Sequence, residues 1–155
     1  MPQFIVSGCQ TLLDFFSRIQ WLAPLTVRLF FGYFWAETGW AKLHNLDGAT
    51  QRFVDWGISH AAFNATLSAG TEFVGGLFLL LGLFTRLTAA AMLFNMIVAI
   101  ALVAIKNVQG LDDFVELDEF TYILIFFWFI IAGPGKASLD TLINRWLGLR
   151  TNQAA

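Results

Sequence analysis

The longest run without a charged residue is the feature that most constrains how this chain can fold. Residues 87–105 contain no Asp, Glu, Lys or Arg over 19 positions, and Arg86 and Lys106 stand at the two ends of the run. As an α-helix the run is about 28 Å long, close to the roughly 30 Å of a bilayer's hydrocarbon core. The run therefore predicts a helix that crosses a membrane.

The composition of the whole chain agrees with a membrane protein. Of 155 residues, 57% are hydrophobic and only 13% are charged. Soluble domains carry about 25% charged residues, and a chain this short could not hide so much apolar surface from water. A net charge of −2 without a basic stripe excludes a nucleic-acid-binding protein, and a single cysteine, Cys9, excludes a disulfide framework.

Three further apolar segments have the length and composition of spans. One covers residues 22–43 and contains Arg28 and Glu37; another covers 62–83 and contains Glu72. The last covers 118–133, is rich in Phe and Ile, and stops at a Gly-Pro-Gly helix breaker. With 87–105 they predict an all-α integral membrane four-helix bundle, one domain over residues 1–155.

The segments at both ends are amphipathic rather than spanning. Apolar residues recur there at helical spacing, at Leu12, Phe15, Phe16, Ile19 and Leu22 near the N-terminus and at Leu139, Leu142, Ile143, Trp146 and Leu147 near the C-terminus. Ser138 is suited to be the N-cap of the second segment. Both patterns predict helices that lie in the membrane interface, and a helix that caps the bundle is the alternative.

The basic residues predict the orientation. Five of them fall on the side that holds both termini, and three fall on the other side: Arg18, Arg86, Lys136, Arg145 and Arg150 against Lys42, Arg52 and Lys106. Because cytoplasmic loops carry the excess of Lys and Arg, both termini are expected in the cytoplasm.

Four polar side chains within the predicted spans are candidate functional residues: Arg28, Glu72, Asn95 and Tyr122. Ionisable residues at membrane depth are costly and mark functional sites by default. Counted inward from the ends of their spans, Arg28 lies at about 9 Å and Glu72 at about 16 Å. We therefore predict a charge-assisted pair between them, with Asn95 and Tyr122 nearby. Such a pair fits two roles, locking the bundle or binding a ligand or proton.

Several motifs together resemble one known family. They are Arg28-Leu29-x-x-Gly32, Gly39-x-x-Lys42-Leu43, Glu72-x-x-Gly75-Gly76, Leu81-Gly82-Leu83-x-Thr85-Arg86-Leu87, Met96-x-x-Ala99 and Gly133-Pro134-Gly135-x-x-Ser138-Leu139-Asp140. Over about residues 28–140 the chain resembles the DoxX family of small bacterial membrane proteins. The resemblance marks Arg28, Glu72, Lys42, Gly75, Gly76, Thr85, Arg86, Ser138 and Asp140 as signature residues. It implies a four-helix bundle in the bacterial inner membrane.

The resemblance also implies work with membrane redox partners, such as thiosulfate–quinone oxidoreductase subunits and complexes that link thiol and superoxide defence. The chain has no Cys-x-x-Cys pair, so we expect a partner-dependent subunit without a redox centre of its own. If the chain serves such a redox reaction, a quinone would suit an apolar cavity lined by Trp35, Phe31 and Leu79 with Arg28 and Glu72 as polar points. Ordinary aromatic packing is the alternative for these apolar residues.

Two other functions stay open at this stage. Residues 35–39 and 117–122 resemble a subgroup encoded beside genes for copper-handling modified peptides of the bufferin type, which implies an accessory role in making or exporting such a peptide. A small-solute transporter is the third reading, and four short spans would then require a homo-oligomer. The histidines, His44 and His60, and the acids near them match no established metal motif, so no metal site is predicted.

Overall fold

The computed structural model describes residues 3–148, and within that range the chain is helical and contains no strand. The helices are α1 (Gln3–Ile19), α2 (Leu22–His44), α3 (Leu46–Asp55), α4 (Ala61–Leu81), α5 (Thr85–Leu102), α6 (Leu111–Val115), α7 (Asp118–Ala132) and α8 (Leu139–Trp146), with a 3-10 helix at Ala104–Asn107. The predicted all-α class is confirmed. Arg150, one of the basic residues used to predict orientation, lies outside the described residues.

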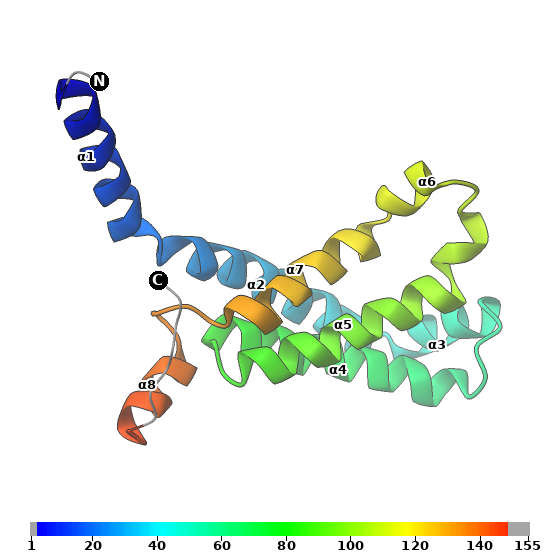
Figure 1. Cartoon of the computed structure of the whole chain (residues 1–155). Helices are drawn as coiled ribbons and strands as arrows, with labels where there is room; N and C mark the ends of the chain where they lie inside the picture. The colour runs from blue at the N-terminus through cyan, green and yellow to red at the C-terminus, as the bar shows by residue number, and fades with distance from the viewer. Residues whose placement is uncertain (1–2, 149–155) are drawn as a thin grey trace.

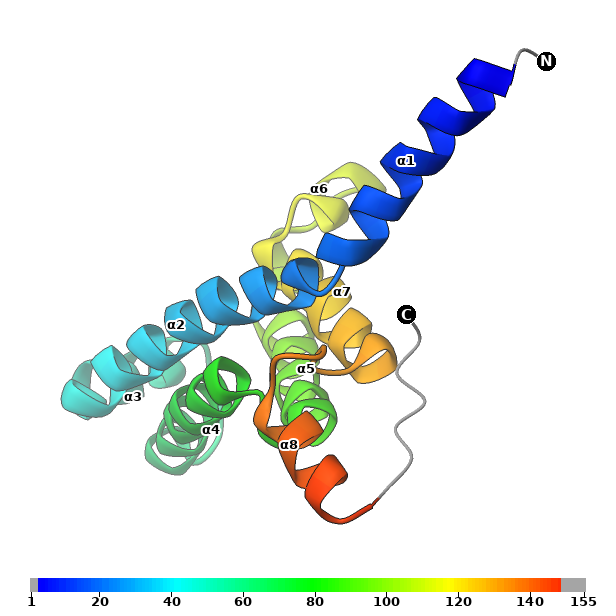
Figure 2. The ribbon, with the colours of Figure 1, turned by 90° about the vertical axis from the view of Figure 1, so that its left-hand side faces the viewer.

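Each predicted span corresponds to a helix, and α2, α4, α5 and α7 form the body of the molecule (Figures 1 and 2). The span predicted at 87–105 ends earlier than expected, since α5 stops at Leu102 and a 3-10 turn follows. Among the described helices, α4 and α5 are long and apolar enough to cross a membrane. The sequence did not predict α3 and α6, which connect the long helices at one end of the body.

Glycines set the packing of α2 on α4. A Cβ on Gly39 would collide with the backbone of Phe73, and a Cβ on Gly76 would collide with the backbone of Ala36. A Cβ on Gly32 would also be too close to the backbone of Leu80, at 2.7 Å from its nitrogen. Small residues allow helices to approach this closely in membrane proteins. The three contacts make α2 and α4 antiparallel, and they show that α2 continues past the last residue of α4.

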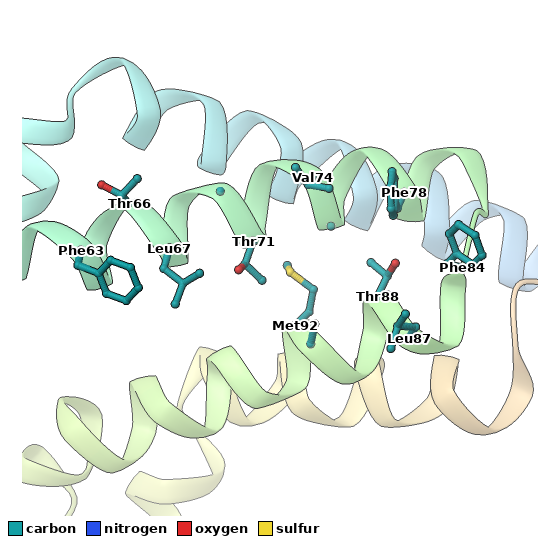
Figure 3. Close-up of a pocket in the computed structure, with 13 residues that line it drawn as sticks. Phe63, Thr66, Leu67, Thr71, Val74, Phe78, Phe84, Leu87, Thr88 and Met92 are labelled. Atoms are coloured by element: carbon teal, nitrogen blue, oxygen red, sulfur yellow. The ribbon is translucent and has the colours of Figure 1, made fainter.

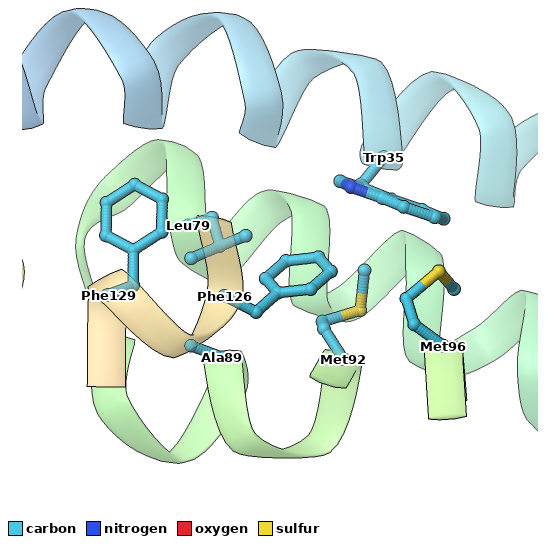
Figure 4. Packing of buried hydrophobic residues seen from close by; sticks show 7 residues of the cluster. All are labelled: Trp35, Leu79, Ala89, Met92, Met96, Phe126 and Phe129. Carbon is cyan, nitrogen blue, oxygen red and sulfur yellow. The ribbon is translucent and has the colours of Figure 1, made fainter. Parts of the chain in front are cut away.

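The buried core joins α7 to the other three long helices (Figure 4). It contains Trp35, Leu79, Ala89, Met92, Met96, Phe126 and Phe129. Phe126 and Phe129 of α7 are fully buried, and Phe126 packs against Trp35 of α2 with ring centroids 5.8 Å apart. Met92 of α5 fits against Gly75, where a side chain would displace its sulfur. Apolar packing of this kind holds the long helices in one register.

The two end helices form as helices outside this core. Helix α1 leads away from the body in both views (Figures 1 and 2), and its apolar side chains from Leu12 to Phe16 are exposed. The expected N-cap of α8 is confirmed, since Ser138 Oγ accepts a hydrogen bond from the Thr141 N–H at 3.2 Å. An interfacial position for α1 and α8 stays a prediction.

Candidate functional site

The structure separates Arg28 from Glu72, so the predicted pair between them is wrong. The prediction assumed that the cytoplasmic ends of the two spans, residue 22 of the first and residue 83 of the second, lie at the same depth in the membrane. In the structure Gly32 lies level with Leu80, so Arg28 lies beyond the last residue of α4. Glu72 lies near Gly39 and Lys42 instead, about 18 Å further along α2 at 1.5 Å per residue. We name the two ends of the body after the short helices beside them: Arg28 is at the α8 end and Glu72 is toward the α3 end.

At the α8 end, Arg28 binds the chain's own backbone. Its guanidinium donates from Nη1 to the carbonyl oxygen of Pro134 at 2.8 Å and from Nη2 to the carbonyl oxygen of Ala137. The residue is 2% exposed. Gly82 has a φ of +65° beside it, and a Cβ there would overlap the guanidinium. Arg28 therefore fastens the loop after α7 to the start of α2.

Asp140 fastens the same loop to the start of α5. Its carboxylate accepts hydrogen bonds from the N–H groups of Phe84 at 2.7 Å and Thr85 at 2.9 Å, and its own N–H donates to the Gly82 carbonyl at 2.9 Å. A negative charge at a helix N-terminus satisfies free donors and the helix dipole. Ser138 Oγ adds a bond to the Gly135 carbonyl at 2.9 Å. We call Arg28, Ser138 and Asp140 the lock.

Toward the α3 end, a second set of polar side chains surrounds the Glu72 carboxylate. Lys42 Nζ lies 2.6 Å from Oε1 and 2.7 Å from Oε2 of Glu72. Ser68 Oγ donates to Oε1 at 3.2 Å, and Asn95 Nδ2 donates to it at 3.4 Å. We call Lys42, Ser68, Glu72 and Asn95 the polar cluster. Glu72 is 2% exposed, whereas the Lys42 side chain is 29% exposed, so the cation keeps an open side.

The polar cluster lies in the wall of a cavity of about 410 Å³. Residues from α2, α3, α4, α5 and α7 line it, and it carries two cations, Lys42 and Arg52, with two acids, Glu72 and Glu119. Most of the remaining lining is apolar or aromatic: Phe34, Trp35, Ala49, Phe53, Trp56, Ile58, Leu67, Met96, Val98, Ala99, Leu102 and Val103. A mostly apolar cavity of this size with a few polar groups is typical of small-molecule sites.

Three of the four candidate residues predicted within the spans line this cavity. Glu72 and Asn95 are joined by a hydrogen bond, and Tyr122 contacts the Trp35 ring edge-on at a centroid distance of 5.2 Å. Arg28 is the exception, at the α8 end. Of the apolar residues expected around the ligand, Trp35 lines the cavity, whereas Phe31 packs against the core and Leu79 lies within it.

From the sequence, Lys42 stands out only as a signature residue, and its pairing with Glu72 was not predicted. The signal was present, because Lys42 shares the helix face of Trp35 and Gly39 that packs on α4. Arg52 was also missed, since α3 was not predicted. Among residues 3–148 no three His, Cys, Asp or Glu side chains gather as a metal site would require. The His44 ring packs against Trp40 with ring centroids 3.9 Å apart and the two planes tilted by 45°.

The other signature residues have structural positions. Gly75 and Gly76 are contact points for Met92 of α5 and Ala36 of α2. Thr85 is buried at the start of α5, where Asp140 binds its N–H. Arg86 donates from Nη2 to the Ile131 carbonyl at 3.3 Å, at the end of α7. These residues hold helices and turns together and lie outside the wall of the cavity at the α3 end.

Comparison with known proteins places the chain among membrane proteins. The DoxX family model matches residues 23–105. The uncharacterized membrane protein Rv3486 of Mycobacterium tuberculosis is 30% identical over 132 residues, which cover 78% of this chain and 81% of that protein. The inner membrane protein YqjF of Escherichia coli is 26% identical over 129 residues, which cover 83% of this chain and 98% of that protein. No solved structure matches the chain.

Proposed function

Because this chain belongs to the DoxX family of membrane proteins, we propose that it is an inner-membrane subunit that binds a quinone for redox partner proteins. The observation that carries the proposal is the cavity toward the α3 end, in which a buried carboxylate and a partly open ammonium share a largely apolar wall. The apolar walls and the few polar groups of the cavity match a quinone head group, which is a flat ring with a polar oxygen at each end.

The polar cluster suits the oxygens of such a head. The open side of Lys42 Nζ can donate a hydrogen bond to a quinone carbonyl, and a carboxylate such as Glu72 can accept one from the hydroxyl of the reduced form. Trp35 and Phe34 offer aromatic faces for the ring. Since Cys9 is the only cysteine of the sequence, any thiol–disulfide chemistry belongs to a partner.

We further propose that α2, α4, α5 and α7 cross the membrane, with the α8 end and both termini at the cytoplasm. Arg18, Arg86, Lys136 and Arg145 support this orientation, because the positive-inside rule counts basic residues near the ends of spans. Cys9, which is exposed, should react with an impermeant maleimide only from the cytoplasmic side. A Ser59→Cys probe in a Cys9→Ser background should react only from the other side. The reverse pattern would overturn the orientation.

A binding titration tests the quinone site directly. The protein is reconstituted in lipid nanodiscs and titrated with a short-tailed benzoquinone, with tryptophan fluorescence as the readout. Glu72→Gln should weaken binding at least tenfold, because the neutral amide no longer holds the Lys42 ammonium in place. The matched control is Glu116→Gln, at an exposed residue away from the cavity, and it should bind as the wild type does. Absence of saturable binding, or equal binding by both variants, would overturn the proposal.

Affinity purification from membranes tests the redox role. We expect mass spectrometry to identify oxidoreductases among the proteins that co-purify with the chain. Recovery of peptide-modifying enzymes instead would favour the alternative role in producing a copper-handling peptide.

A further inference from the structure

A second apolar hollow runs along the outside of the body between α4 and α5 (Figure 3). Its volume is about 600 Å³. Its lining is entirely apolar, glycine, or threonine: Phe63, Thr66, Leu67, Gly70, Thr71, Val74, Gly75, Phe78, Phe84, Leu87, Thr88, Ala91 and Met92. We call it the groove. Phe63 and Leu87 on its rims are 68% and 72% exposed, so it opens toward the surroundings of the helices, which for this family is lipid.

The groove adjoins the cavity. Leu67 lines both hollows, so its side chain forms a wall that they share on α4. The two helices are in contact where Met92 meets Gly75, and Figure 3 shows α5 diverging from α4 in the direction of Phe63. Glu72 follows the groove residue Thr71 in the chain, and Asn95 lies one helical turn after Met92. A molecule that lies in the groove is therefore next to the cavity that holds the polar cluster, with Leu67 between the two.

Building on the quinone site proposed above, we propose that the groove holds the isoprenoid tail of the quinone. The head then reaches the polar cluster sideways, from within the bilayer, by passing Leu67 between the diverging helices. The groove fits a tail rather than a lipid head group because no charged side chain lines it, while the charged residues lie beyond Leu67 in the cavity.

The tail is expected to add selectivity more than affinity. A tail that moves from lipid into the groove exchanges one apolar environment for another, so the gain comes from packing and not from removal of water. Filling the groove should therefore weaken binding of a long-tailed quinone by about tenfold, the factor that corresponds to 1.4 kcal/mol. Binding of a tail-less quinone should not change, because its head lies in the cavity alone.

Gly70 provides a precise test. A Cβ at this position meets no other atom within 4 Å, so Gly70→Leu places a side chain in the groove without displacing a helix. Gly8→Leu in α1 is the matched control, since Gly8 is equally unobstructed and lies far along the chain from the groove. Leu67→Trp, which narrows the junction between the two hollows, is a second variant. Each protein is titrated in nanodiscs with a ten-isoprene quinone and with its tail-less head group, and its unfolding temperature is measured alongside.

Gly70→Leu and Leu67→Trp should each bind the long-tailed quinone with about tenfold lower affinity than the wild type. Their affinity for the tail-less quinone should not change. Gly8→Leu should bind both quinones as the wild type does. Equal affinities for the long-tailed quinone on wild type and Gly70→Leu would overturn the tail site while leaving the head site intact. Failure of both quinones to bind the wild type would instead overturn the proposed function. A phospholipid that native mass spectrometry finds on the wild type and not on Gly70→Leu, with quinone binding unchanged, would assign the groove to a structural lipid and also overturn the inference.

Discussion

The two ends of the body use buried charge in opposite ways. At the α8 end, the side chains of Arg28 and Asp140 form hydrogen bonds with backbone groups, namely carbonyl oxygens after α7 and N–H groups at the start of α5. Toward the α3 end, Glu72 and Lys42 bond to side chains, and Lys42 keeps an open side in a cavity. The lock directs its hydrogen bonds to the fold and leaves only the buried Arg28 Nε without a partner among its described groups, whereas Lys42 of the polar cluster keeps an open side toward the cavity.

This difference divides the signature residues of the family into those that fasten the fold and those that have room to bind a ligand. Arg28, Ser138 and Asp140 are signature residues of the family, and their contacts make them fasteners of one loop. A buried ionisable residue in a membrane protein is a functional candidate only until its partners are known. The comparison predicts that substitutions in the lock reduce stability, and that substitutions in the polar cluster reduce binding.

The largest effect on stability is expected at Arg28. Arg28→Ala removes two charged hydrogen bonds and leaves the carbonyls of Pro134 and Ala137 unpaired, at a cost of about 3 kcal/mol. Unfolding in detergent would measure the loss, and the folded fraction should bind the short-tailed quinone within twofold of wild type. Loss of binding without loss of stability would place Arg28 in the ligand site and break the comparison.

Lys42→Met should cost less, about 2 kcal/mol, because it strands the buried Glu72 carboxylate with only Ser68 and Asn95 as donors. Unlike Arg28→Ala, it should also weaken quinone binding at least tenfold. The measurement pairs unfolding with the nanodisc titration. Lys136→Met, on the loop after α7, is the control and should affect neither quantity.

Asp140→Asn is expected to cost about 1.5 kcal/mol. The amide keeps one acceptor for Phe84 or Thr85 but loses the charge that favours the start of α5. Hydrogen exchange should speed up in the first turn of α5, with the cavity unaffected. Equal protection of the α5 amides in the wild type and in Asp140→Asn would show that the Asp140 cap contributes nothing to the stability of this helix.

The smallest effect is expected at Asn95. Its hydrogen bond to Glu72 is long, at 3.4 Å, so Asn95→Ala should cost less than about 0.5 kcal/mol. Quinone affinity should fall about threefold, because the residue lines the cavity. A loss of stability as large as that of Lys42→Met would mean that Asn95, rather than Lys42, is the principal partner of the carboxylate.

The sequence predicted the helices well and the contacts between them less well. The uncharged run beyond Arg86 and the Gly-Pro-Gly breaker limit where spans can begin and end, and Ser138 marked the start of α8 correctly. The pairing of Arg28 with Glu72 failed because hydrophobicity fixes the length of a span but not how far one helix slides along another. That offset depends on which glycine meets which backbone, as Gly39 meets Phe73, and no single sequence states it.

The candidate site was predicted in part for the same reason. Glu72, Asn95 and Tyr122, which the sequence groups as polar residues within the spans, all line the cavity. Arg52 was not predicted, because it reaches the cavity only through the short helix α3, which lies between two predicted spans.

The division into two independent charged sites is tested most directly by a pair of double-mutant cycles on the free energy of unfolding. One cycle combines Glu72→Gln with Lys42→Met, and the other combines Glu72→Gln with Arg28→Ala. The structure predicts a coupling of about 1 kcal/mol or more in the first cycle, because the side chains are in contact, and additivity within about 0.5 kcal/mol in the second. Strong coupling between Arg28 and Glu72, with none between Lys42 and Glu72, would contradict the account.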